Sequence, residues 1–167
     1  KGVAITHEAA WNIIKDINQK FFISSQDSVL GLSKLNFDLS VYDIFGLLSC
    51  GGTLVYPILS RYMDPSHWVE LIQEYEITIW NSVPAFMQIL TGYFTGKNEK
   101  LPLRIVLLSG DWIPVGMPGD IQKCASGDAR VISLGGATEA SIWSIYHECV
   151  DNEIREVSIP YGKPLSN

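Results

Sequence analysis

Short apolar segments alternate with segments of helical periodicity along most of this chain of 167 residues. The apolar segments predict strands, and the others predict helices because their apolar residues recur every three or four positions. The expected strands are 28–33, 53–56, 77–80, 104–108 and 130–134, and the expected helices are about 6–22, 40–48, 64–76, 84–94 and 114–125. This repeated order predicts right-handed crossovers and an α/β fold of three layers, in which helices cover both faces of a mostly parallel sheet.

The length of the chain suits a single α/β domain, 1–167, with one core. Thr6 is an expected N-cap, and Asp64 is another because Pro65 follows it. The segment 141–150 alternates apolar and polar residues, which adds one more strand that the pattern allows to run antiparallel. The chain opens without a methionine and stops within a Pro- and Gly-rich phrase, so we expect a piece of a longer protein.

Composition excludes several classes of function. The net charge of −6, with no basic stripe, argues against a nucleic-acid surface. No apolar run approaches the roughly 20 residues that a membrane-spanning helix needs. Cys50, Cys124 and Cys149 are too widely spaced for a zinc site, and we expect them to be reduced thiols in a cytoplasmic protein.

Polar residues follow three of the expected strands, at the edge where parallel sheets bind ligands. They are Asn81 with Ser82, the run 109–111, and the run Gly135, Gly136, Ala137, Thr138 and Glu139. The last run combines bare backbone, a hydroxyl and a carboxylate, which suits a nucleotide phosphate with Mg²⁺. The alternative is a tight turn in which Thr138 caps the next segment.

Four phrases in order resemble the adenylation domains of nonribosomal peptide synthetases, which are adenylate-forming enzymes. The phrases are Lys1-Gly2-Val3 with Thr6-His7, then 37–40 leading into 42–52, then 136–139, and finally 159–164. The resemblance implies that ATP activates an amino acid as its aminoacyl adenylate, which the phosphopantetheine thiol of a partner carrier-protein domain then captures. It also implies neighbouring synthetase domains as partners.

The resemblance assigns roles to the residues of the nucleotide site. Glu139 resembles the carboxylate that holds Mg²⁺, and Thr138 resembles the hydroxyl that contacts the α-phosphate. The nucleotide would also meet Gly110, Asp111, Gly135, Gly136 and Ala137. Two positions depart from the family pattern: Gly135 replaces an aromatic residue that stacks on adenine, and Ala137 replaces a proline.

Asp38 is the first candidate for substrate binding. It lies between Phe37 and Leu39 in a largely apolar stretch, where a carboxylate is tolerated if an ammonium group pairs with it. In the resembling enzymes this aspartate binds the α-amino group of the substrate. The alternative is an acid at a helix N-terminus, with Ser40 sharing the capping role.

The resemblance also outlines a small amino-acid pocket, similar to that of cysteine-activating domains. Its walls would be Asp38, Leu39, Tyr42, Asn81, Leu107, Ser109, Leu134, Ile142 and Trp143. Serine and glycine remain open as substrates, because an apolar pocket discriminates between such side chains by only about 1–3 kcal/mol. Taken singly, Leu107, Leu134 and Ile142 are equally compatible with a strand core.

We therefore expect part of an amino-acid adenylating ligase. The family's phosphate loop is expected before residue 1, and its C-terminal subdomain with the catalytic lysine after residue 167, so we expect these residues alone to be inactive. A catalytically silent nucleotide-binding or docking module of the same fold is the alternative. An acyl-CoA ligase is disfavoured, because its substrate offers Asp38 no amine.

Overall fold

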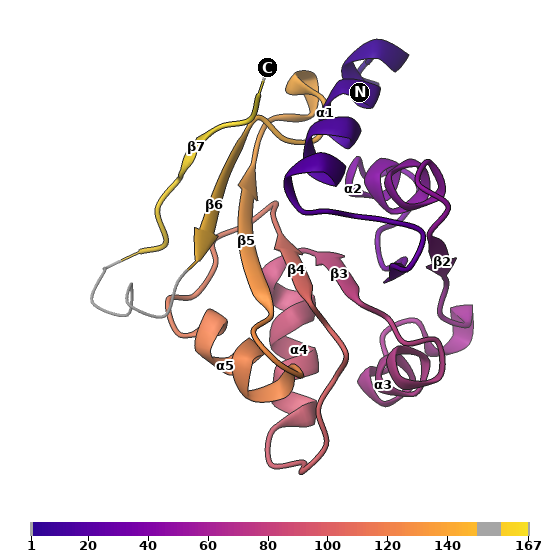
Figure 1. The fold of residues 1–167 in the computed structure, drawn as a ribbon, viewed down its shortest axis with the longest axis vertical. Helices are drawn as coiled ribbons and strands as arrows, with labels where there is room; N and C mark the ends of the chain where they lie inside the picture. Colours follow the sequence, from indigo (N-terminus) through magenta and orange to yellow (C-terminus); the bar gives the residue numbers. More distant parts are fainter. Residues whose placement is uncertain (1, 150–157, 167) are drawn as a thin grey trace.

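Strands from the whole length of the chain form one mostly parallel sheet in the computed structural model, which describes residues 2–149 and 158–166 (Figure 1). Across the sheet the strands are β2 (Thr53–Val55), β1 (Ser28–Leu30), β3 (Ile79–Ser82), β4 (Ile105–Leu108), β5 (Arg130–Gly135), β6 (Ile145–Cys149) and β7 (Lys163–Pro164). The first five are parallel, and β6 and β7 are antiparallel additions at one edge. The expected strand after residue 141 is thus confirmed as antiparallel, although Val150 lies outside the described residues, as does Lys1.

Helices cover both faces of the sheet, which confirms the expected three layers (Figure 1). The helices are α1 (His7–Lys20), α2 (Leu39–Val41), which continues as a π-helical turn (Tyr42–Gly46), α3 (Pro65–Glu74), α4 (Pro84–Phe94) and α5 (Met117–Cys124), with short 3-10 turns at Leu59–Arg61 and Thr138–Ala140. One buried cluster joins the sheet to α3, α4 and α5, and a second joins it to α1 and the α2 segment. No described helix is long and apolar enough to cross a membrane.

The central strands are apolar on both sides because each side meets a helical layer. On β4, Val106 and Leu108 belong to the cluster beneath α3, α4 and α5, whereas Ile105 and Leu107 belong to the cluster beneath α1. Successive side chains of a strand point to opposite faces, so a strand buried on both faces is a continuous apolar run. This explains why short apolar segments, without alternation, predict the strands correctly.

Local signals place the helix starts well. The Thr6 hydroxyl accepts a hydrogen bond from the Ala9 amide at 3.1 Å, and the Asp64 carboxylate accepts one from the Ser66 amide at 2.9 Å, so both expected N-caps are confirmed. The expected helix 40–48 differs, because its middle widens into the π-helical turn. A Cβ at Gly46 would lie 2.8 Å from the ring of Tyr42, so glycine allows that ring to pack against the turn.

Other boundaries also differ from the sequence prediction: β1 ends at Leu30 instead of Ser33, and β6 begins at Ile145 instead of Ser141. Strand β3 begins at Ile79 and includes Asn81 and Ser82, two residue types of low strand propensity that hide its true end. Helix α5 begins at Met117 instead of Pro114, because the preceding residues form a turn that a Met117 to Pro114 hydrogen bond of 2.9 Å closes.

A buried carboxylate, Asp27, joins the amino ends of the three central strands. It accepts hydrogen bonds from Arg104 Nε at 2.7 Å, Arg104 Nη2 at 2.6 Å and the Thr78 hydroxyl at 2.7 Å. Asp27 immediately precedes β1, Thr78 precedes β3 and Arg104 precedes β4. The guanidinium of Arg104 also donates to the carbonyl oxygens of Phe21 and Phe22, just beyond α1. One carboxylate therefore fixes three strands and a helix end.

The pKa of Asp27 is lower than usual. Burial raises it, but the hydrogen bonds from Arg104, Thr78 and the Ser24 amide outweigh burial. Because the folded state favours the ionised form, this carboxylate stabilises the fold above the ordinary pKa of 3.8, and the stabilisation is lost as pH falls below it.

Asp27→Asn should therefore lower the free energy of unfolding of the intact protein by about 2–4 kcal/mol at pH 7, because it leaves Arg104 without its anion. The difference from the unaltered protein should shrink at pH 3, as measured by urea unfolding at both values. Asp120→Asn is the matched control, since Asp120 forms an exposed ion pair with Lys123. Equal effects of the two substitutions at pH 7 would contradict the role of Asp27.

Candidate functional site

The residues expected to bind ligands gather at the carboxyl ends of the central strands. Asn81 lies on β3, the run 109–111 follows β4, and the run 136–139 follows β5. These strands are adjacent and parallel, so the three runs meet at one edge of the sheet. The loop that carries Asp38 reaches the same edge, where it contacts Thr138.

A hydrogen bond joins the two motifs that lie 100 residues apart. The Thr138 hydroxyl donates to Asp38 Oδ2 at 2.6 Å. Asp38 occupies the N-cap position of α2, but its side chain makes no capping hydrogen bond, and the hydroxyl of Ser40 bonds to the Phe37 carbonyl. Asp38 is therefore an acid at a helix N-terminus, as the alternative expected, but neither Asp38 nor Ser40 caps that end with its side chain. The capping alternative is wrong for Thr138, because the N-cap of the following 3-10 turn is Ala137, which precedes it.

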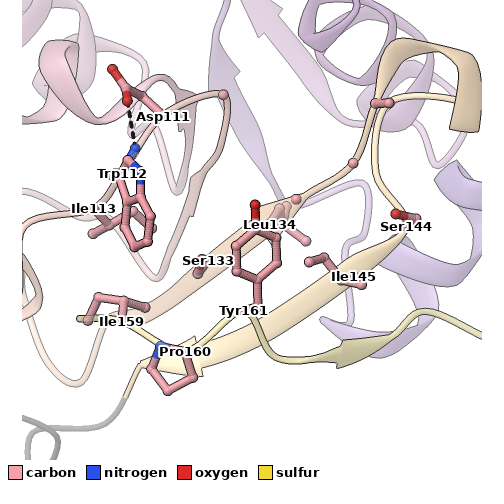
Figure 2. A pocket seen from close by; sticks show the side chains of 14 residues that line it. Asp111, Trp112, Ile113, Ser133, Leu134, Ser144, Ile145, Ile159, Pro160 and Tyr161 are labelled. Carbon is pink, nitrogen blue, oxygen red and sulfur yellow. Dashed lines mark hydrogen bonds between the residues drawn. The ribbon is translucent and has the colours of Figure 1, made fainter. Parts of the chain in front are cut away.

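A cavity of about 620 Å³ contains the predicted nucleotide residues Gly110, Asp111, Gly135, Gly136 and Ala137 in its lining (Figure 2). Trp112 and Tyr161 line the same cavity and are aromatic residues that are 69% and 75% exposed. The sequence reasoning missed both rings. Trp112 directly follows the predicted nucleotide residue Asp111, and Tyr161 belongs to the last of the four phrases. These positions in the sequence could have identified both residues as candidates for the nucleotide site.

The paired glycines have different neighbours. A Cβ at Gly136 would lie 2.8 Å from backbone atoms of Trp143 and Ser144, so no other residue fits beside that returning chain. A Cβ at Gly135 would lie 3.0 Å from the Ile145 side chain and 4.0 Å from the ring of Tyr161. Tyr161 therefore lies next to the space that a side chain on residue 135 would enter.

A second cavity, of about 760 Å³, lies between α1 and the loop that carries Asp38. Thr138, Ser141 and Ile142 line it together with Asp38, so the predicted residue Thr138 is separated from the other nucleotide residues. The turn 135–141 thus runs between the two cavities. Glu139, the predicted Mg²⁺ ligand, is an exposed residue of this turn and lines neither cavity.

Strained backbone follows this turn. Ser141 and Ile142 have φ angles of 65° and 67°, and Ile142 is β-branched. Such conformations cost on the order of 1–3 kcal/mol each and concentrate at functional sites. They direct Ile142 and Trp143 into the core, where these side chains are 5% and 1% exposed.

The predicted amino-acid pocket is a tightly packed group of side chains. Of the nine residues, Asp38 and Ile142 line the second cavity, Leu134 lines the first, and six line neither: Leu39, Tyr42, Asn81, Leu107, Ser109 and Trp143. All six are buried. The indole N–H of Trp143 donates to the Ser109 hydroxyl at 3.0 Å, and the rings of Tyr42 and Trp143 are 5.1 Å apart. The structure thus buries most of the predicted walls outside the lining of these two cavities.

Asp43 is a buried neighbour that the sequence reasoning missed. Its Oδ1 accepts a hydrogen bond from Asn81 Nδ2 at 2.7 Å. Burial raises the pKa of Asp43 to about 7, although the Asn81 and Ser33 amides hold it down. An acid directly after Tyr42, in an otherwise apolar helical segment, was the available signal.

Comparison of the sequence with known protein families identifies the family of this chain. The family described as AMP-binding enzyme matches residues 1–167. The chain belongs to that family. Among residues 2–149 and 158–166 no group of three or more His, Cys, Asp or Glu side chains forms a metal site by itself.

Individual relatives confirm the resemblance to nonribosomal peptide synthetase adenylation domains. Bacitracin synthase 1 of Bacillus licheniformis is 50% identical over 167 residues, which are 100% of this chain and 3% of that protein. Pyochelin synthetase PchF of Pseudomonas aeruginosa is 47% identical over 99% of this chain and 9% of its own length. The α-methyl-L-serine-AMP-bound structure of the nonribosomal peptide synthetase FmoA3 matches with a TM-score of 0.93 and 40% identity, over 100% of this chain and 19% of that one. The chain thus spans a small part of the synthetases it matches.

Proposed function

We propose that this chain belongs to an adenylation domain that activates a small amino acid, cysteine by preference, for transfer to a carrier-bound phosphopantetheine thiol. The observation that carries the proposal is the hydrogen bond between Asp38 and Thr138, because it joins a residue proposed to bind the amine to one proposed to bind the phosphate. Activation requires the substrate carboxylate and the α-phosphate to lie within reach of each other.

Each group at this rim has a proposed role. The Asp38 carboxylate attracts the ammonium group of the amino acid and orients its carboxylate toward Thr138. Once the ammonium group pairs with Asp38, the Thr138 hydroxyl is proposed to turn from that carboxylate and donate to a phosphate oxygen. Glu139 suits Mg²⁺, which binds proteins through one or two carboxylates and otherwise prefers the phosphates of its nucleotide. Such an ion supplies positive charge to the phosphates when bound.

Cysteine as the substrate is supported by the size of the predicted pocket and by its polar groups. The packing of Tyr42, Trp143 and several aliphatic side chains supports a short substrate side chain, for which Asn81 and Ser109 are proposed to supply the polar atoms. The FmoA3 structure is named for a bound α-methyl-L-serine adenylate, which supports a small amino acid with a polar β-substituent. Serine is therefore the second candidate substrate.

Tyr161 is proposed to supply the ring on which the adenine base stacks. Gly135 offers no side chain, and the ring of Tyr161 lies 4.0 Å from where a Cβ on that residue would be. Figure 2 shows the ring standing over the end of β5, in the lining of the first cavity. An aromatic ring from the final phrase of the chain can thus replace the ring that residue 135 lacks.

Amino-acid-dependent exchange of pyrophosphate into ATP by the intact protein tests the substrate. Cysteine should give the highest kcat/KM, with serine about 10–200-fold lower and phenylalanine inactive, because pocket size and one polar contact set the discrimination. Exchange with phenylalanine but not cysteine would contradict the proposed substrate. A protein that gives no exchange and binds neither ATP nor cysteine in calorimetry would be a silent module.

Asp38→Asn tests the binding of the amine. It keeps the size of the side chain and removes its charge, so kcat/KM for cysteine should fall at least about 100-fold. The affinity for ATP, measured by calorimetry, should fall far less than the activation of cysteine, because Asp38 lies outside the first cavity and reaches the nucleotide only through its hydrogen bond to Thr138. Normal cysteine activation by this variant would remove Asp38 from the site.

Tyr161→Ala tests the stacking of the base. The KM for ATP should rise about tenfold, in line with the loss of one base–aromatic stack, while the KM for cysteine stays unchanged. Tyr161→Phe should retain the unaltered KM because it retains the ring. Tyr93→Ala is the matched control, since Tyr93 is an exposed tyrosine on α4. A KM for ATP that Tyr161→Ala does not change would assign the base to another surface.

A further inference from the structure

Asp43 is a buried acid for which the proposed reaction has no direct use. Its side chain belongs to the π-helical turn that follows α2 and is 1% exposed. Burying a carboxylate costs free energy unless specific partners compensate it. Asp43 interacts with the backbone amide of Ser33 and with the side-chain amide of Asn81, which belongs to the proposed amino-acid pocket.

The surroundings of Asn81 determine the orientation of its amide. Its Nδ2 lies 2.7 Å from Asp43 Oδ1 and 3.4 Å from the Leu39 carbonyl oxygen, and both of these atoms are acceptors. When Asp43 is ionised, the opposite orientation would place the Asn81 carbonyl against two acceptors, so the observed orientation is the favoured one. The Oδ1 atom of Asn81 consequently faces away from Asp43 and Leu39.

The Oδ1 atom of Asn81 is buried and accepts no hydrogen bond from the described residues. Two donors of the pocket are engaged elsewhere: the Tyr42 hydroxyl donates to Asn18 Oδ1 at 2.9 Å, and the Trp143 indole donates to Ser109. The strand neighbour of Asn81 on β4 is Leu107, which offers no side-chain donor. A buried carbonyl oxygen of this kind is costly, and a bound donor would satisfy it.

We propose that Asp43 is a specificity-determining positioning residue, which holds the Asn81 amide so that its Oδ1 accepts a hydrogen bond from the S–H or O–H group of the substrate side chain. The inference rests on the proposed function, because it requires the amino-acid side chain to reach Asn81. Asp43 acts through Asn81 and touches no reacting atom. The ligand class is an α-amino acid with a hydrogen-bond donor on its β-carbon.

This arrangement favours a donor in the substrate over an apolar group of equal size. 2-Aminobutyrate has a methyl group in place of the thiol of cysteine, so it fills the same space and leaves Asn81 Oδ1 unpaired. A site with a fixed polar group rejects the analogue that lacks the matching donor more strongly than an apolar pocket does. Without Asp43 the amide can rotate, and this discrimination should disappear.

The test is the ratio of kcat/KM for the donor-bearing substrate to that for 2-aminobutyrate, measured by pyrophosphate exchange with the intact protein. The donor-bearing substrate is cysteine or serine, whichever the unaltered protein activates more efficiently. The unaltered ratio should exceed about tenfold. In Asp43→Leu, which keeps the volume and removes the acceptor, it should fall to within about threefold of unity, mainly through a higher KM for the donor-bearing substrate.

Asp43→Ala is a second variant, so that the test survives if the leucine variant fails to fold. An unchanged KM for ATP identifies the variants that retain the site. Ser28→Ala is the matched control, because Ser28 is a buried hydroxyl that bonds to the Tyr75 and Glu76 carbonyls, remote from Asn81. Its ratio should equal that of the unaltered protein.

The outcomes separate the two proposals. A ratio that stays high in an Asp43 variant with normal KM for ATP overturns the role of Asp43. An unaltered protein that activates cysteine or serine without preference over 2-aminobutyrate leaves the proposed function in place and overturns the hydrogen bond to Asn81. A protein that activates neither cysteine nor serine overturns the proposed substrate class, and this inference with it.

Discussion

The hydrogen-bonded carboxylate of Asp27 aligns the starts of strands β1, β3 and β4, and the position of the candidate site depends on this alignment. It binds Arg104 and Thr78 where β4 and β3 begin, beside the start of β1, so the three central strands share a common starting level. The strands are short, and their far ends are therefore level as well. Asn81 and Ser109 therefore meet at one edge, and the pairing of β5 with β4 brings the turn after β5 to the same edge.

Among the described residues, buried polar side-chain atoms are fully hydrogen-bonded at one edge of the sheet and partly unpaired at the other. Both carboxylate oxygens of Asp27 have partners at the amino edge. At the carboxyl edge lie the buried side-chain oxygens that lack a hydrogen bond in the described part of the chain, on Asp43, Asn81 and Ser141. Unpaired buried groups reduce stability, and proteins keep them mainly where a ligand or a reaction makes use of them. Stability is thus concentrated at one edge and binding capacity at the other.

The sequence predicts features that depend on neighbouring residues and misses those that depend on distant ones. The strand and helix order, the N-caps of Thr6 and Asp64 and the carboxyl-edge position of the site all follow from local patterns. The π-helical turn, the place of Tyr161 beside Gly135 and the pairing of Asp43 with Asn81 depend on contacts between distant segments. The left-handed backbone of Ile142 runs against the preference of its residue type, so no local rule predicts it.

Gly136 has a structural role in addition to its place in a nucleotide motif. The backbone of Trp143 and Ser144 passes so close that even a methyl group would collide with it. This glycine is therefore required for the chain to close upon itself, whether or not a nucleotide ever binds. A related protein without catalytic activity would still need this glycine in order to fold. The glycine by itself therefore indicates the fold, and the ionisable residues around it are the better indicators of catalytic activity.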